Sequence, residues 1–249
     1  MLQLRPIPGT RAVTTSPDTV AVFSTLRPAD VLGPLKDVER KFAPELLYLA
    51  GDSGLLVRGP RVAVVGSRKA TADGLRRAAA LTRALVQRDI VVVSGLAAGI
   101  DTAAHSTALE SGGRTIAVLG TPLDLTYPKE NAALQQRLAR EQLVVSQFAP
   151  GTAVTPKNFP IRNRTMALLT DATVIVEAGE NSGSVQMGRS ALALGRPVGL
   201  LRSVVAESGA AWVAEFIERG AFVLDRSGLA SWAHAISDER RFGRDRRAA

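Results

Sequence analysis

One apolar run that ends in glycine constrains the fold of this chain more than any other stretch. Residues 62–65 are Val-Ala-Val-Val, and Gly66-Ser67-Arg68 follow directly. A short β-branched run bounded by glycine predicts a strand that is buried on both faces, as in a parallel sheet. Apolar residues recur at helical spacing over residues 75–86, so the glycine is predicted to lie on a strand-to-helix turn. Backbone N–H groups and the positive end of a helix dipole meet at such a turn and favour phosphate.

Strand and helix patterns alternate through the rest of the chain. Apolar, strand-like runs are found at residues 90–93, 115–119, 143–145, 173–176, 198–201 and 222–224. Helical patterns lie between and after them, at residues 101–110, 129–140, 164–169, 185–194, 212–218 and 229–236. Alternation of this kind predicts an α/β fold, with a mostly parallel sheet and helices on both of its faces.

The sequence predicts one main domain at residues 43–237, with a short segment at each end. Residues 1–42 contain seven prolines and glycines, which prevent a long helix and leave room for one short helix over 31–42. We expect this N-terminal extension to be partly mobile, with a free tail at residues 1–17, and its remainder to pack on the main domain. The basic tail at residues 238–249 is either a solvated end or a weak nucleic-acid arm.

Composition favours a polyanionic partner in a reducing compartment. The chain has 31 Lys and Arg residues against 23 Asp and Glu, which gives a formal net charge of +8. It has no cysteine, so disulfides and thiol chemistry are excluded and a cytoplasmic location is expected. No apolar run approaches the roughly 18 residues of a membrane helix, so no membrane association is expected.

Five loops are predicted to gather beyond the carboxyl ends of the strands, where such sheets bind their ligands. They lie at residues 66–68, 94–99, 120–122, 157–164 and 179–184. Four of the five contain glycine, and all contain a hydroxyl or a basic residue, so their rim suits phosphate better than acid–base chemistry. In the first loop, Ser67 either caps the following helix or donates a hydrogen bond to an anion.

No catalytic constellation stands out in the sequence. The dinucleotide motif Gly-x-Gly-x-x-Gly and the P-loop are absent, and two histidines without a cysteine argue against a zinc site. Asp101 and His105 are four residues apart on one predicted helix, where we expect a capping and packing role. Glu177 and Glu180 flank the fifth loop, either as exposed acids or as acceptors for backbone or sugar groups. We therefore expect no catalytic residue, no metal and no cofactor.

The loop at residues 157–164 carries the strongest signal for a ligand. Three cations and two amides surround Phe159 there, in a chain with few aromatic residues. Bases of a single-stranded nucleic acid stack on such a ring while cations hold the backbone. The alternative is that Phe159 is a core residue and that one arginine of the loop pairs with an acid such as Glu177.

Several motifs resemble one family when they are taken together. The resemblance covers about residues 43–236, in the family's order and spacing. The motifs that carry it are Gly66-Ser67-Arg68, Ser94-Gly95-Leu96-Ala97-Ala98-Gly99-Ile100-Asp101, Leu123-Asp124 with Tyr127-Pro128, Phe159-Pro160-Ile161-Arg162-Asn163-Arg164, and Val176-Glu177-Ala178 with Ser182-Gly183-Ser184. On these motifs the chain resembles the DprA/Smf family, DNA-processing protein A.

This resemblance implies an extended Rossmann-like core that binds single-stranded DNA without catalytic turnover. It also implies a homodimer that protects incoming DNA and helps to load the RecA recombinase during natural transformation. By matching positions, Arg68 would contact backbone phosphate, and Lys157, Phe159, Arg162 and Asn163 would belong to the DNA groove. The full set of implied DNA-binding residues is Gly66, Ser67, Arg68, Ser94, Gly95, Lys157, Phe159, Arg162, Asn163, Arg164, Ser182, Gly183 and Ser184.

Two other functions stay open at this point. The chain is also similar to nucleotide-binding proteins and phosphoribohydrolases of the wider superfamily, whose loop reads Gly-Gly-x-Gly-Thr-x-x-Glu. Met187 occupies the place of that glutamate, which argues against hydrolysis while leaving a small nucleotide possible. A third interpretation is a scaffold that acts through dimerisation or partner contacts, with its last helices around Trp212, Phe216 and Trp232 as the interface.

Overall fold

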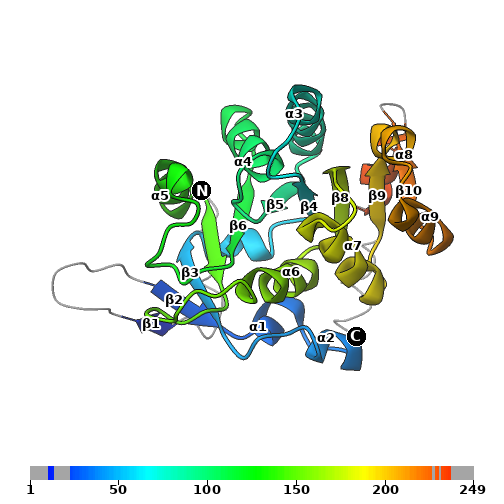
Figure 1. Ribbon diagram of the computed structural model, residues 1–249. Helices are drawn as coiled ribbons and strands as arrows, with labels where there is room; N and C mark the ends of the chain where they lie inside the picture. The colour runs from blue at the N-terminus through cyan, green and yellow to red at the C-terminus, as the bar shows by residue number, and fades with distance from the viewer. Residues whose placement is uncertain (1–10, 14–22, 226–227, 230, 237–249) are drawn as a thin grey trace.

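The computed structural model describes residues 11–13, 23–225, 228–229 and 231–236, which build one sheet with helices on both faces (Figure 1). The sheet has ten strands in the order β1-β2-β3-β7-β6-β5-β4-β8-β9-β10. The strands are β1 (Arg11–Val13), β2 (Phe23–Leu26), β3 (Leu47–Gly51), β4 (Arg61–Gly66), β5 (Val91–Ser94), β6 (Thr115–Leu119), β7 (Leu143–Ser146), β8 (Ala172–Glu177), β9 (Val198–Leu201) and β10 (Phe222–Leu224).

Most of the sheet is parallel. Every neighbouring pair from β7 across to β10 is parallel, whereas β1, β2 and β3 join antiparallel at one edge and β3 pairs antiparallel with β7. The predicted fold class, a mostly parallel α/β sheet of the extended Rossmann-like kind, is therefore confirmed.

The helices form a layer on each side of the sheet. Figure 1 shows α3, α4 and α5 along one face and α6 and α7 along the other. The helices are α1 (Pro28–Leu32), α2 (Asp37–Arg40), α3 (Ala72–Val86), α4 (Ile100–Glu110), α5 (Ala132–Glu141), α6 (Asn158–Leu169), α7 (Gly183–Ala193), α8 (Arg202–Ser208) and α9 (Ala211–Glu218), with 3-10 turns at Ser53–Leu56 and Lys129–Asn131. Residues 228–229 and 231–236 are also helical. Across the described ranges, no helix is both long and apolar enough to cross a membrane.

Alternate side chains of β4 explain why the run at residues 62–65 is apolar throughout. Val62 and Val64 pack against α3 in one core cluster, whereas Ala63 and Val65 pack against α6 and α7 in another. All four are buried. Because both faces of the strand are covered, residues 62–65 are all apolar, and the buried Arg61 at the start of β4 donates to the carbonyl oxygen of Leu56.

The strand order reverses between β4 and β8. After β4 the chain continues through β5, β6 and β7 on one side, and β8 then returns to pair with β4 on the other. In open α/β sheets a crevice forms at such a reversal, beyond the carboxyl ends of the two strands. The helices that follow the two strands, α3 and α7, therefore both begin beside this crevice.

The N-terminal segment contributes two strands to the main sheet, which the sequence does not predict. β2 pairs with β3, so the sheet crosses the domain boundary expected at residue 42, and Arg11–Val13, expected in a free tail, form β1. Two short helices, α1 and α2, replace the single helix expected at 31–42, because Gly33 and Pro34 lie between them. The other residues of the expected tails, 1–10, 14–17 and 238–249, lie outside the described residues.

Helix α6 begins earlier than the sequence predicts. Residues 158–163, expected in a loop, form its first turns. Pro160 is tolerated because it occupies the first turn, where a backbone N–H has no partner within the helix. The hydroxyl of Thr155 donates to Oδ1 of Asn158 at 2.8 Å and ties the preceding loop to the helix start. Helix α8 is not predicted from the sequence at all.

Candidate nucleic-acid interface

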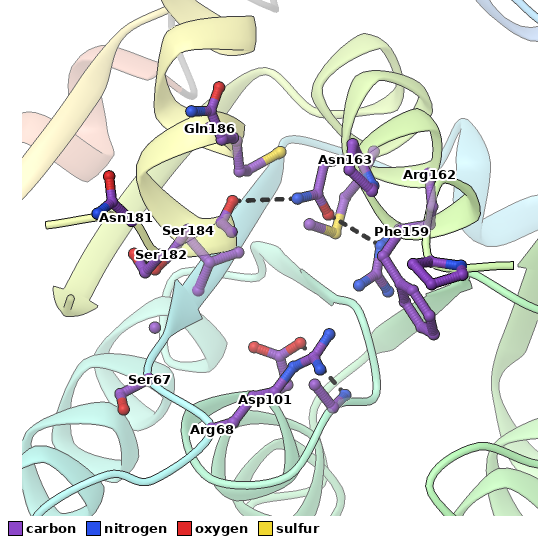
Figure 2. Close-up of a pocket in the computed structure, with 18 of the residues that line it drawn as sticks. Ser67, Arg68, Asp101, Phe159, Arg162, Asn163, Asn181, Ser182, Ser184 and Gln186 are labelled. Carbon is purple, nitrogen blue, oxygen red and sulfur yellow. Dashed lines mark hydrogen bonds between the residues drawn. The ribbon is translucent and has the colours of Figure 1, made fainter. Parts of the chain in front are cut away.

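A groove of about 960 Å³ lies at the reversal point between β4 and β8 (Figure 2). Its lining comes from five segments: the turn after β4, the start of α4, the loop after β6, the first turns of α6 with the loop before them, and the start of α7. Four of the five loops that the sequence predicts to gather thus contribute lining residues, and the remaining one, at residues 120–122, lies beside the groove, where Gly120 packs against Phe159.

The turn after β4 is shaped by close packing. A Cβ on Gly66 would lie 2.5 Å from Cγ1 of Ile100 and 3.0 Å from the carbonyl oxygen of Glu177, so only glycine fits. The hydroxyl of Ser67 accepts a hydrogen bond from the backbone N–H of Lys69 at 3.1 Å. Arg68 and Lys69 are exposed and both line the groove. This turn therefore places two cations at the rim.

Helix α3 is capped by Thr71, not by Ser67. The hydroxyl of Thr71 accepts from the N–H of Gly74 at 2.9 Å and itself donates to Oε2 of Glu177 at 2.5 Å. The carboxylate of Glu177 also accepts from the backbone N–H of Thr71, at 3.1 and 3.2 Å. Glu177 thus holds the start of α3 at the carboxyl end of β8, and it is not the partner of an arginine from α6.

One face of α6 lines the groove and the other faces solvent. Phe159, Arg162, Asn163 and Met166 follow the helical spacing of three and four residues and all line the cavity. Lys157 and Arg164 are exposed and lie outside the lining. Of the cations predicted in this segment, the structure brings only Arg162 into the cavity, because the segment is a helix and its opposite faces diverge.

Arg162 is buried and joins α6 to β6 and to the loop after β5. Its side chain is 5% exposed, and Nη1 donates to the carbonyl oxygens of Gly95 at 2.5 Å and Val118 at 2.6 Å. Nε donates to Oδ1 of Asn163 at 2.9 Å. Burial lowers the pKa of Arg162 to about 10, against the nearby Asp101 carboxylate, which raises it. The guanidinium therefore remains charged at neutral pH.

Ser94 and Gly95 lie behind the groove. The Ser94 hydroxyl is buried and donates to the carbonyl oxygen of Val64 at 2.7 Å. Gly95 faces the guanidinium of Arg162, and a Cβ at this position would collide with it. Neither residue lines the cavity. In this chain, Ser94 and Gly95 therefore serve the packing of the strands and of Arg162.

Asp101 and His105 stabilise the start of α4 and its packing. The Asp101 carboxylate accepts from the N–H groups of Gly95 at 3.1 Å and Ala97 at 3.3 Å, and burial raises its pKa. His105 Nδ1 lies 2.8 Å from Oγ1 of Thr115, and burial lowers the pKa of His105 to about 3. The imidazole is therefore neutral. The expected packing role is confirmed, whereas the expected capping role is wrong, because Asp101 binds the loop before α4 and the N-cap of the helix is Gly99.

The start of α7 forms the opposite wall. Ser182 caps the helix by accepting from the N–H of Val185 at 3.3 Å, and its hydroxyl lies 2.8 Å from that of Ser184. Asn163 Nδ2 donates to the carbonyl oxygen of Gly183 at 3.0 Å and joins this wall to α6. Ser182, Gly183 and Ser184 all line the groove. Figure 2 shows Ser67 and Ser182 on one side of the cavity and Phe159 on the other.

The groove also contains residues that are not in the set of implied DNA-binding residues. They are Lys69, Tyr127, Asn181 and Gln186. Lys69 was signalled only by its position beside Arg68. Tyr127 comes from a segment remote in sequence, yet its ring centroid lies 5.3 Å from that of Phe159, and the Arg68 guanidinium carbon lies 5.3 Å from the Phe159 centroid. No local pattern predicts these contacts.

The exposed cations, hydroxyls and backbone N–H groups of the groove suit phosphate, and the aromatic pair, which Arg68 contacts, suits a base. A Rossmann-like sheet with such a groove at its reversal point is typical of proteins that bind nucleotides or nucleic acids.

Comparison with known proteins identifies the family. The sequence model of DNA recombination-mediator protein A matches residues 29–230, so the chain belongs to this family and the resemblance drawn from the motifs is confirmed. The DNA processing protein DprA of Streptococcus pneumoniae is 44% identical over 156 residues, which are 63% of this chain and 55% of the relative. A putative DNA processing protein DprA of Mycobacterium tuberculosis is 40% identical over 186 residues, 74% of this chain and 48% of the relative. The chain thus spans about half the length of these relatives.

Solved structures show the same relationship. DNA processing protein A from S. pneumoniae matches with a TM-score of 0.70 and 36% identity, over 81% of this chain and 71% of that one. DNA processing protein A from Helicobacter pylori, whose structure is described for its single-stranded DNA binding mode, matches with a TM-score of 0.72 and 29% identity, over 87% of this chain and 96% of that one. A molybdenum cofactor carrier protein from Chlamydomonas reinhardtii, 20% identical at a TM-score of 0.50, shares the fold alone.

Proposed function

We propose that this chain binds single-stranded DNA in the groove between β4 and β8 and makes or breaks no bond there. The observation that carries the proposal is the meeting of exposed Arg68 and Lys69 with the aromatic pair of Phe159 and Tyr127 in one cavity. Membership of the DNA recombination-mediator protein A family and the similarity to a structure described for single-stranded DNA binding support it.

The groove favours a single strand over a duplex on physical grounds. Aromatic rings bind the faces of bases, and a duplex hides those faces in its own stack. Arg68, Lys69 and the N–H groups of the turns bind phosphate, which every sequence offers. The affinity for single-stranded DNA should therefore decrease steeply with salt concentration and depend little on base sequence.

The groove is poorly equipped for hydrolysis. Among its lining residues in the described part of the chain, Asp101 is the one acid, and its carboxylate is buried and held by two backbone N–H groups. Met187, at the place of the hydrolase glutamate, lines the cavity as an apolar residue. A nucleotide-hydrolysing function is accordingly not favoured.

The wider role follows from the family resemblance. As a homodimer, the protein protects incoming single strands and helps RecA to form filaments on them during transformation. This part is tested by following RecA assembly on DNA already covered by a single-strand binding protein. Faster assembly with this chain supports the role, and an unchanged rate contradicts it.

Competition binding tests the primary proposal. A fluorescent single-stranded oligonucleotide is bound to the protein, and unlabelled single strand, duplex of the same sequence and AMP compete for it in fluorescence anisotropy. We expect the single strand to compete most strongly, the duplex weakly and AMP negligibly, with the labelled strand recovered intact. Displacement by AMP at concentrations below those of the single strand would favour a nucleotide-binding protein instead.

A further inference from the structure

The Phe159 ring is already enclosed by its neighbours. The Arg68 guanidinium carbon lies 5.3 Å from the ring centroid, within cation–π range. A Cβ on Gly120 would lie 2.7 Å from Cδ1 of Phe159, so the backbone of the loop after β6 presses on the ring edge. The Tyr127 ring packs against it at 5.3 Å with an interplanar angle of 51°. Phe159 is therefore partly buried and offers less surface to a base than an exposed ring would.

A base cannot insert between the two rings. Stacking on both sides would require two successive contacts of about 3.5 Å, or about 7 Å between parallel planes. The Tyr127 and Phe159 centroids are 5.3 Å apart and the planes are tilted by 51°. A base must therefore lie on an outer face of the pair.

Tyr127 offers that outer face. It is 49% exposed, it lines the groove, and no hydrogen bond joins its hydroxyl to another described residue. Its loop is held in place by hydrogen bonds: Thr121 Oγ1 and Gln135 Nε2 both donate to the carbonyl oxygen of Leu125, at 3.2 Å each. Asn131 Nδ2, just after the loop, donates to the carbonyl oxygen of Leu96 at 2.9 Å. The ring is thus an exposed platform on a fixed support.

We infer that a DNA base stacks on the ring of Tyr127 and that Phe159, packed against the other side of this ring, positions Tyr127. This inference rests on the proposed function of the groove. Arg68 contacts the Phe159 ring and lies beside Lys69, so it joins the aromatic platform to the cations that bind phosphate. One nucleotide can then place its base on Tyr127 while its phosphate meets Arg68. The platform accepts any base, because each has a π-face.

Two substitutions at Tyr127 separate stacking from other effects. Tyr127→Ala should weaken binding of a single-stranded oligonucleotide by about 5- to 150-fold, the range measured for loss of one stacked base. Tyr127→Phe keeps the ring and should stay within about twofold of the parent chain. Equal affinity of Tyr127→Ala and the parent chain, with the parent binding the strand normally, would overturn this inference and leave the proposed function intact. A parent chain that binds no single strand would overturn both.

The affinity for an abasic oligonucleotide distinguishes a contact between Tyr127 and a base from a purely structural role of Tyr127. Removing the bases should weaken binding to the parent chain by about as much as Tyr127→Ala does, and it should cost Tyr127→Ala little further. Additive losses would show that Tyr127 does not contact a base.

Photocrosslinking tests the unsubstituted protein directly. A strand carrying 5-iodouracil is irradiated on the parent chain, and the crosslinked peptide is identified by mass spectrometry. We expect the crosslink at Tyr127. A crosslink at Phe159 with none at Tyr127 would reverse the two roles and contradict the inference.

Discussion

Removal of the buried guanidinium of Arg162 should destabilise the whole domain. Arg162→Ala deletes three hydrogen bonds, to the carbonyl oxygens of Gly95 and Val118 and to Oδ1 of Asn163. It also leaves Asp101, whose pKa burial already raises, without the cation that lowers it. Strands β5 and β6 would then lose their shared contact with α6.

The size of the effect follows from the burial of these groups. Hydrogen bonds from a charged donor contribute about 1.5–3 kcal/mol each, so three would contribute up to about 9 kcal/mol. The cost of burying the cation offsets part of this, as its pKa of about 10 indicates. Breaking a buried charged contact by removing one partner typically costs about 3–5 kcal/mol, and we expect that range here. For a chain of this size the melting temperature should fall by about 6–20 °C.

Thermal and urea denaturation of matched variants measure this loss. Arg164→Ala removes the same side chain from the exposed face of the same helix and should change stability by less than about 0.5 kcal/mol. Equal stability of Arg162→Ala and Arg164→Ala would show that the buried guanidinium does not hold α6 to the sheet.

Two further predictions concern the same interior. Gly95→Ala places a methyl group against the Arg162 guanidinium and should lower the free energy of unfolding by about 1–3 kcal/mol. A Cβ at Gly183 meets no atom closer than 3.6 Å, so Gly183→Ala should be tolerated. Equal urea midpoints for the two variants would contradict the close packing of Gly95 against Arg162. The pKa of His105 falls from 6.5 to about 3 on folding, so between these pH values the unfolded chain binds one more proton than the folded chain. The free energy of unfolding therefore decreases as the pH falls below 6.5, by at most about 1.4 kcal/mol per pH unit. Nuclear magnetic resonance should show an imidazole of His105 that does not titrate above about pH 4, and a midpoint near 6.5 would refute its burial.

The central sheet could be predicted from the sequence because its signal is local. Strands buried on both faces must be apolar at successive positions, and β4, β5, β6 and β8 satisfy this without exception at their centres. Gly66 marks the turn after β4 in the sequence, but the reason that only glycine fits there is a tertiary contact, since a side chain would strike Ile100 at the start of α4.

The first turns of α6, residues 158–163, are not predicted as helix because their buried face is polar. Arg162, Asn163 and Thr165 are buried beside Met166 and Leu168, so apolar residues do not repeat at helical spacing in its first turns. The side chain of Arg162 is buried at the groove wall, whereas Lys157 and Arg164 are exposed outside the groove. Tyr127 was not recognised as a site residue because its contact with Phe159 joins segments that only the folded sheet brings together.

The salt dependence of DNA affinity shows whether the cations of this groove bind the phosphates of the strand. Arg68→Ala removes a cation from the groove, whereas Arg88→Ala removes an exposed one between α3 and β5, at the opposite end of the sheet, with the same change in net charge. In a plot of log affinity for a single strand against log salt concentration, each phosphate contact contributes a slope of about 0.7. We predict that Arg68→Ala reduces the slope by about this amount and that Arg88→Ala leaves it unchanged. Equal reductions in the two variants would show that net charge, and not this groove, binds the strand.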